Sequence, residues 1–256
     1  MFAPVACAPA KSPGRYNHFD SRVSAVLRRG FSLFGECVLI KAVLFDLDGT
    51  LADSLLDLAK STNYAIGKFG YPARETERYK YYAGDGMPKM IERALPEDGK
   101  NPENVAKILP VFLEYYGKHY CDNTKAYPGM VELIDSLKDR GITVAVVTNK
   151  AQEMAEKVVG KLYGGRFDLI LGKCEGIPPK PDPTAALIAM KKLGVTPEDC
   201  VFVGDSEMDV KTGVNSGAYP VGVLWGFREK EELLGGGAKK IIERPQELLA
   251  IIDELG

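Results

Sequence analysis

The sequence predicts an α/β fold in which a doubly wound, parallel, Rossmann-like sheet carries an inserted helical cap domain. Short apolar runs rich in β-branched residues recur along the chain, and helical segments alternate with them. Such runs are typical of strands that are buried on both faces of a parallel sheet. One long helical stretch interrupts the alternation after the first run, which indicates an insertion.

Five apolar runs are interpreted as the strands of this sheet. They are residues 41–45, 143–147, 169–171, 200–203 and 219–223. Four helices are expected around them, because a glycine follows each of the first three segments and a proline opens the last. They are residues 131–140, 183–193, 209–216 and 245–255. Strands and helices in this order favour a doubly wound sheet.

The insertion shows helical patterns and no strand-like run between Ser54 and Tyr127. Its predicted helices are residues 55–69, 75–82, 87–95 and 101–120. We therefore assign residues 54–127 to the cap domain, and residues 41–53 and 128–256 to the α/β core. Because the insertion follows the carboxyl end of a strand, it would cover the crevice where open α/β sheets bind ligands. The breaks near 53–55 and 127–129 are the expected hinges of cap closure.

The first 40 residues differ in composition from the rest and are set apart as an N-terminal extension outside the core fold. They carry five basic side chains against two acidic ones, together with several Ser, Ala and Pro residues. This composition is compatible with an organelle transit peptide. An overextended reading frame or a remnant of cloning is the favoured interpretation, and a transit peptide is the alternative, because the first predicted strand begins only at Lys41.

The net charge excludes nucleic acid and membrane surfaces as expected partners, and the cysteine content indicates a reducing compartment. The chain has 33 basic and 35 acidic side chains and a net charge of −2. Neither nucleic acid nor a membrane surface is therefore an expected partner. The five cysteines form no CxxC pair, which favours reduced thiols in the cytoplasm over a disulfide framework. No apolar run approaches the ~18 residues of a membrane-spanning helix.

Two carboxylates lie at the end of the first predicted strand. Asp46 and Asp48 point the same way if the chain stays extended, and Gly49 allows a tight turn directly afterwards. Paired carboxylates serve metal binding, nucleophilic attack or general acid–base catalysis. Exposed acids in a turn or a helix cap are the alternative interpretation.

Three further polar clusters follow later strands. Thr148 and Asn149 can bind phosphate oxygens without adding charge, or cap the next helix. Lys180 lies between prolines that fix the backbone around one cation, which suits a charge held on a phosphate, although a surface lysine would look the same. Asp205 and Asp209 suit Mg²⁺, which prefers carboxylates with water and phosphate oxygens; an acidic helix N-terminus is the alternative.

The stretches DLDGT, VTN, KPDP and GDSEMD together resemble the four motifs of the haloacid dehalogenase superfamily, over about residues 41–256. Most members of that superfamily are phosphatases that form a covalent aspartyl-phosphate. The resemblance implies that Asp46 attacks phosphorus, while Asp48 protonates the leaving alcohol and then activates water. It implies that Thr148 and Lys180 hold the phosphoryl group.

The resemblance also implies a Mg²⁺ site. Its ligands would be Asp46, the backbone carbonyl of Asp48, and Asp205. Asp209 would support the site through water or through Lys180. A cation and a lysine suit this chemistry, because the transferring phosphoryl group spreads negative charge in its transition state.

Individual residues narrow the choice within the superfamily. Asp48 favours phosphate chemistry over dehalogenation, and Leu58 stands where β-phosphoglucomutases carry a histidine. Gly84, Asp85 and Gly86 are similar to the Gly-x-Gly cap loop of the phosphoglycolate phosphatase group, so they are expected to set substrate specificity. An ordinary turn between two helices is the alternative interpretation of this loop.

The expected activity is Mg²⁺-dependent hydrolysis of a small phosphate monoester, with 2-phosphoglycolate as the first candidate. A pyrophosphatase, or a sugar-phosphate or nucleotide phosphatase of the same superfamily, is the alternative, because their caps are similar. A non-catalytic binding protein is a more remote alternative, since a fold does not imply a function. The expected partner is a small phosphorylated metabolite, and the expected assembly is a monomer or a homodimer.

Overall fold

A six-stranded parallel sheet forms the centre of the computed structural model, which describes residues 39–256. The strands are β1 (Ala42–Phe45), β4 (Thr143–Ala151), β5 (Leu169–Lys173), β6 (Cys200–Gly204), β7 (Tyr219–Val223) and β8 (Lys240–Ile242). Their order across the sheet is β5-β4-β1-β6-β7-β8. The chain thus builds outward from β1 first on one side and then on the other. This reversal creates a switch point beside β1, where open parallel sheets bind ligands.

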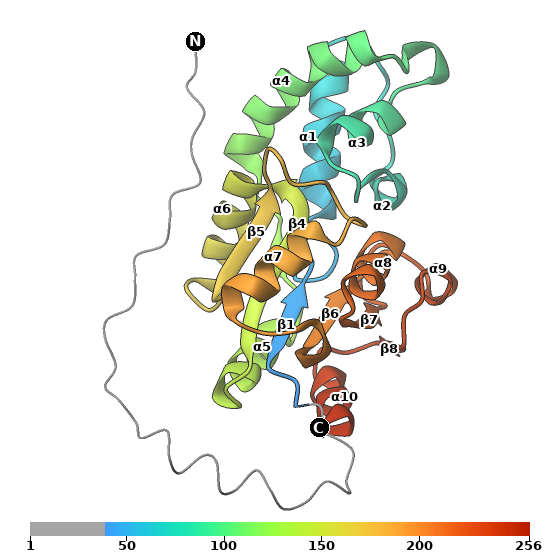
Figure 1. Cartoon of the computed structure of the whole chain (residues 1–256). Coiled ribbons are helices and arrows are strands. Elements are labelled where there is room, and N and C mark those ends of the chain that lie inside the picture. The colour runs from blue at the N-terminus through green and yellow to red at the C-terminus, as the bar shows by residue number, and fades with distance from the viewer. Residues whose placement is uncertain (1–38) are drawn as a thin grey trace, which may run out of the picture. The chain divides into compact units, whose positions relative to one another are not determined.

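Helices cover both faces of the sheet (Figure 1). They are α5 (Met130–Asp139), α6 (Gln152–Tyr163), α7 (Thr184–Leu193), α8 (Glu207–Ser216), α9 (Lys230–Gly235) and α10 (Glu247–Leu255). Successive residues of a strand point to opposite faces. Accordingly, Val43 and Phe45 pack in one apolar cluster with α5, α6 and α10. Ala42 and Leu44 pack in another with α7. All four side chains are buried because both faces are covered.

The helical insertion lies beyond the carboxyl ends of the central strands (Figure 1). Its helices are α1 (Leu55–Gly67), α2 (Tyr79–Tyr82), α3 (Met87–Ala94) and α4 (Pro102–His119). They share an apolar cluster of their own, which includes Ile66, Ile91 and Phe112. Phe227, from the core loop after β7, joins that cluster and ties it to the core. The two connections of the insertion pair as a short antiparallel ribbon, β2 (Ala52–Asp53) with β3 (Lys125–Ala126).

The predicted fold class is confirmed, and all five predicted strands are present. β4 continues beyond its predicted end to Ala151, because a shift of register lets Ala151 pair with Lys173 of β5. The sequence pattern did not predict α6, α9, β8 or the β2–β3 ribbon. Short strands such as β8 gain their hydrogen bonds from a neighbour that is remote in sequence. The predicted helix 75–82 is a 3₁₀ turn followed by the short α2.

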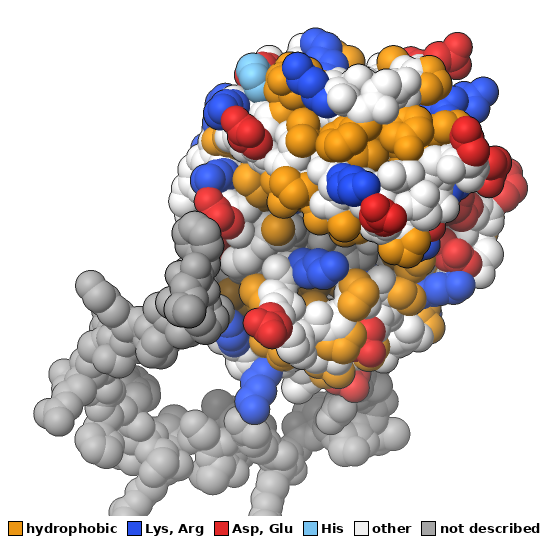
Figure 2. Space-filling model, turned by 90° about the horizontal axis from the view of Figure 1, so that it is seen from above, with side chains coloured by type: hydrophobic (Ala, Val, Ile, Leu, Met, Phe, Trp, Pro, Cys, Tyr) orange, Lys and Arg blue, Asp and Glu red, His pale blue; other side chains and the backbone are white. Residues whose placement is uncertain are grey.

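Other expectations concern surfaces and membranes. Within residues 39–256, every helix is too short or too polar to cross a lipid bilayer. Seen from above, basic and acidic side chains are interspersed over the visible face (Figure 2). The predicted N-terminal extension, residues 1–40, falls outside the described part of the chain except for its last two positions.

Candidate active site

Three aspartates meet at the carboxyl edge of the sheet. Asp46 directly follows β1, and Asp205 directly follows the neighbouring β6. Asp209 lies in the first turn of α8, where Ser206 and Asp209 form a reciprocal capping box. The Ser206 hydroxyl donates to Asp209 Oδ2 at 2.6 Å and fixes this carboxylate. The three side chains are buried, and each places one oxygen within 4.8 Å of the others.

Lys180 is the cation of this cluster. Its Nζ lies 2.7 Å from Asp46 Oδ1 and 2.5 Å from Asp209 Oδ1, and its side chain is 3% exposed. Burial acts to lower the pKa of Lys180, but the carboxylates of Asp209 and Asp46 outweigh it and raise that pKa above the usual value. The ammonium is therefore a permanent positive charge between two of the carboxylates.

The third carboxylate has only neutral donors. Asp205 accepts hydrogen bonds from the Thr50 hydroxyl at 2.8 Å and from the Phe227 N–H at 2.9 Å. Burial, followed by the charges of Asp209 and Asp46, raises the pKa of Asp205 well above its usual value. Burial and the charge of Asp209 likewise raise the pKa of Asp46 to about 6.

The cluster fits a divalent cation. When all three carboxylates are ionised, the single ammonium of Lys180 leaves two buried negative charges uncompensated, and the raised pKa values of Asp46 and Asp205 reflect that excess. Hard cations with oxygen ligands, such as Mg²⁺, compensate that excess. Glycine also brings the backbone close to the cluster. A Cβ atom at Gly49, where φ is +90°, would lie 2.3 Å from Asp205 Oδ2. Only glycine accommodates both the positive φ and this approach.

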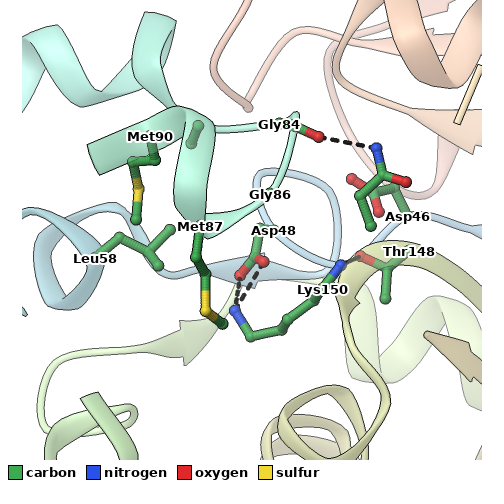
Figure 3. Close-up of a pocket in the computed structure, with 11 residues that line it drawn as sticks. Asp46, Asp48, Leu58, Gly84, Gly86, Met87, Met90, Thr148 and Lys150 are labelled. Carbon is green, nitrogen blue, oxygen red and sulfur yellow. Dashed lines mark hydrogen bonds and ion pairs between the residues drawn. The ribbon is translucent and has the colours of Figure 1, made fainter. Parts of the chain in front are cut away.

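The side chain of Asp48 turns away from the cluster of Asp46, Asp205 and Asp209. The chain does not stay extended after β1, because the N–H groups of Leu51 and Ala52 fold back onto the Leu47 carbonyl. The Asp48 carboxylate instead accepts two hydrogen bonds from Lys150 Nζ, at 2.9 and 2.8 Å (Figure 3). A third comes from the Ser54 hydroxyl at 2.6 Å.

Sequence reasoning did not single out Lys150. This lysine follows Asn149 on the unpredicted extension of β4, and its side chain is 2% exposed. The signal that could have found it is its position, since it directly follows a polar cluster that ends an apolar strand. Its partner is 102 positions away in sequence, so local pattern does not reveal the pair.

Thr148 and Asn149 lie beside the aspartates, as expected, and line the same cavity as Asp46 and Asp48. The Thr148 hydroxyl accepts a hydrogen bond from the Lys150 N–H at 3.3 Å. The Asn149 amide connects two segments of backbone. Its Oδ1 accepts from the Lys180 N–H at 2.8 Å, and its Nδ2 donates to the Gly84 carbonyl at 3.0 Å.

The cap loop closes the cavity from above. Gly84 and Gly86 line it, both with positive φ, and Asp85 does not. Asp85 forms an ion pair with Arg93 of α3. The cap also contributes the larger apolar side chains of Leu58, Met87 and Met90 (Figure 3), together with Ala83. The volume of the cavity is about 60 Å³.

Comparison with known proteins identifies the class that this fold and site define. The family model of the haloacid dehalogenase-like hydrolases matches residues 43–223, and the chain belongs to this family. The resemblance inferred from the four motifs is therefore confirmed.

Two named relatives and one solved structure narrow the comparison. Phosphoglycolate phosphatase 1 of Pseudomonas aeruginosa is 32% identical over 84% of this chain and 81% of its own length. The N-acetylmuramic acid 6-phosphate phosphatase of the same organism is 31% identical over 84% of this chain and 95% of its own length. The crystal structure of a protein from Lactobacillus delbrueckii subsp. bulgaricus is 33% identical and matches with a TM-score of 0.79, covering 83% of this chain and 98% of that one.

Proposed function

We propose that this protein is a Mg²⁺-dependent phosphatase that hydrolyses a small phosphate monoester, 2-phosphoglycolate, through an aspartyl-phosphate at Asp46. The observation that carries the proposal is the buried cluster of three carboxylates around one ammonium, at the edge of a cavity beneath the cap. Such a cluster suits a cation and a phosphoryl group far better than it suits an apolar or uncharged ligand.

The metal ligands in this proposal are Asp46, the backbone carbonyl of Asp48, and Asp205. Asp209 acts indirectly, because its two oxygens already accept hydrogen bonds from Lys180 and Ser206. Bound Mg²⁺ would supply charge neutralisation between the anionic nucleophile and the anionic ester. The roles of these residues rest on the geometry of the donors and on the family to which the chain belongs.

The reaction follows from the positions of the remaining groups. A carboxylate oxygen of Asp46 attacks phosphorus, and the bond from phosphorus to the leaving oxygen breaks. Lys180 and Thr148 stabilise the negative charge of the transferring group. Asp48 gives a proton to the leaving oxygen, and later takes one from the water that hydrolyses the aspartyl-phosphate. Asp48 suits this role because it lines the cavity between Asp46 and the cap.

The size of the cavity supports a small substrate. Its volume of about 60 Å³ is well below the ~300–1,000 Å³ of pockets for drug-sized ligands. A two-carbon ester suits it better than an amino-sugar phosphate or a nucleotide does. Among the named relatives, this favours the phosphoglycolate phosphatase over the N-acetylmuramic acid 6-phosphate phosphatase.

We further propose that residues 54–127 form a cap domain that closes over the bound ester. Two hydrogen bonds support closure: Asn149 donates to the Gly84 carbonyl, and Arg228 Nη2 donates to the Ala83 carbonyl at 3.2 Å. A closed cap excludes water from the aspartyl-phosphate until the alcohol has left. A cytoplasmic site of action agrees with the free thiols of Cys121 and Cys200. A monomeric or homodimeric assembly stays a prediction.

Phosphate release from a panel of esters tests the proposed function. The panel contains 2-phosphoglycolate, pyrophosphate, N-acetylmuramic acid 6-phosphate and a nucleoside monophosphate, each with Mg²⁺ and with a chelator. We expect Mg²⁺-dependent release that is greatest for 2-phosphoglycolate and falls by at least ~10⁴-fold in Asp46→Asn, because an amide cannot attack phosphorus. Asp139→Asn, an exposed change on α5, is the matched control.

The outcomes separate the alternatives. Preference for another ester would reassign the substrate and leave the reaction intact. A folded, metal-loaded protein that releases phosphate from none of the esters would favour the non-catalytic binding protein. Undiminished release by Asp46→Asn would exclude the aspartyl-phosphate at this residue.

A further inference from the structure

Lys150 is a buried cation that the proposed reaction does not use. Lysine is almost never buried unless it is paired, and the Lys150 side chain is 2% exposed. Its Nζ donates to both oxygens of Asp48 and lies 5.1 Å from the centre of the Tyr116 ring of α4. Lys150 therefore connects a core strand with Asp48 and with the cap.

The surroundings of Lys150 give this cation a second role besides pairing. Among the described residues that line the cavity, Lys150 is the sole basic one. Asp46 and Thr148 lie at the phosphoryl end of the cavity, whereas Leu58, Met87 and Met90 form an apolar wall on the cap side. Figure 3 shows the Lys150 ammonium beside Asp48, and Met87 lines the same cavity. An anionic group that enters so apolar a space needs a cation, because burial of an unpaired charge is costly.

We propose that Lys150 binds the carboxylate of the substrate, and that Asp48 holds this ammonium only until a carboxylate competes for it. The inference rests on the proposed function and deepens it by naming the residue that selects the substrate. The leaving oxygen lies near Asp48, and the carboxylate of a two-carbon ester lies only two bonds further on. It therefore comes within reach of an ammonium that is 2.8 Å from Asp48.

The exchange of partners links recognition to chemistry. With the substrate carboxylate on Lys150, Asp48 keeps its hydrogen bond from Ser54 and is free to face the leaving oxygen. An ester without a carboxylate leaves Asp48 held by Lys150. The site therefore selects short phosphate esters that carry a carboxylate next to the ester carbon, and it does so with a strand residue of the core rather than with the cap loop.

A pair of esters tests the inference. 2-Phosphoglycolate and ethyl phosphate have the same two-carbon length, and a methyl group replaces the carboxylate in the second. In Lys150→Met we expect kcat/KM to fall for both esters, because Asp48 loses its partner. The fall for 2-phosphoglycolate should exceed that for ethyl phosphate by about 10- to 100-fold, the range of a charge-assisted hydrogen bond. Lys157→Met, at an exposed lysine paired with Glu153, is the control that leaves the ratio unchanged.

An equal loss for both esters would overturn the inference and leave Lys150 as a positioning residue for Asp48. Because Lys150 is buried, each variant is first checked by circular dichroism and thermal melting. Lys150→Gln is the second variant, which keeps a hydrogen-bond donor and removes the charge. Lys150→Gln should show the same larger loss of kcat/KM for 2-phosphoglycolate than for ethyl phosphate. A folded Lys150→Gln that retains kcat/KM equally for both esters would also contradict the inference.

A binding measurement separates this inference from the proposed function. In an Asp46→Asn background with Mg²⁺, calorimetry gives the Kd of each ester with Lys150 or with Met at position 150. Selective weakening of 2-phosphoglycolate binding, by about 10- to 100-fold, supports the inference even if the natural enzyme releases no phosphate from it. Turnover of 2-phosphoglycolate together with equal changes in both Kd values would support the function and overturn the inference.

Discussion

The two sides of the cavity differ in the kind of side chain that they present. The core side presents buried charges, with Asp46 and Asp205 at strand ends and Lys180 between carboxylates. The cap side presents apolar side chains, such as Met87 and Met90, and backbone of the cap loop. Hydrogen bonds from core side chains to the carbonyls of residues 83 and 84 join the two sides.

This difference indicates that the two sides have different functions, with the chemistry on the core side and the enclosure of the ester on the cap side. Asp46 and Asp205, which must keep their geometry, directly follow β1 and β6, whose positions are fixed by neighbouring strands on both sides and by packing on both faces. The apolar side chains that enclose the cavity lie on the helical layer above the core. Changes to the charged groups around Lys180 should therefore alter rate and stability together, whereas changes to the apolar cap side should alter which size of ester is accepted.

Among the changes that test this comparison of the two sides, the largest combined effect on rate and stability is expected for Lys180→Met. Its loss leaves Asp46 and Asp209 buried without their cation, so the metal-free protein should lose about 3–5 kcal/mol of unfolding free energy. The value of kcat/KM should fall by about 10²–10³-fold, because one stabilising charge on the phosphoryl group is gone. Urea unfolding and phosphate release measure the two losses, with the exposed Lys191→Met as control. Loss of rate without loss of stability would contradict the coupling on the core side.

A smaller effect is expected at the junction of cap and core, where Asp57 of α1 holds the return connection. Its carboxylate accepts four hydrogen bonds from Asn123 and Thr124, at 2.6 to 2.9 Å. Burial acts to raise the pKa of Asp57, but these hydrogen bonds outweigh it and hold the pKa below the usual value. Asp57→Asn should cost about 1–3 kcal/mol of unfolding free energy at pH 7.

The pH dependence of that cost follows from the lowered pKa. The ionised carboxylate stabilises the folded state at any pH above the ordinary aspartate value of about 4. The stabilisation disappears as the pH falls further, through the lowered pKa of the folded state. Thermal melting of both proteins at pH 7 and pH 3 should thus show a difference that shrinks in acid. A difference that stays constant or grows in acid would show that ionisation of Asp57 is not its source.

The smallest effect is expected for Met87→Ala on the cap side. Shortening this partly buried side chain widens the cavity without touching a charge. We expect kcat/KM for 2-phosphoglycolate to fall by no more than about 10-fold, the range for loss of a few buried methylenes. Release from larger esters, such as N-acetylmuramic acid 6-phosphate, should rise relative to it. An equal fall in kcat/KM for every ester would contradict this difference between the two sides, because Met87 would then affect the rate in the same way as the core-side groups.

The sequence was enough to predict that Asp46 and Asp205 lie close together at one edge of the sheet. Asp46 and Asp205 each follow a short apolar run, and the carboxyl ends of parallel strands meet at one edge of a sheet. The helical insertion was predictable for a similar reason, since apolar periodicity and glycine or proline breaks are local signals. The direction of Asp48 was less predictable, because its expected alignment with Asp46 required an extended chain, and the backbone turns there.

By itself, the sequence determined most of the elements, their parallel arrangement, and the arrival of Asp46, Asp205 and Lys180 at the carboxyl edge of the sheet, because these properties follow from local periodicity and from strand ends. The tertiary structure alone decided the pairing of Lys150 with Asp48, the attachment of Arg228 to the cap loop, and the volume left between cap and core. The two pairs join residues 102 and 145 positions apart. Such contacts depend on how whole layers pack, and no local pattern encodes that packing.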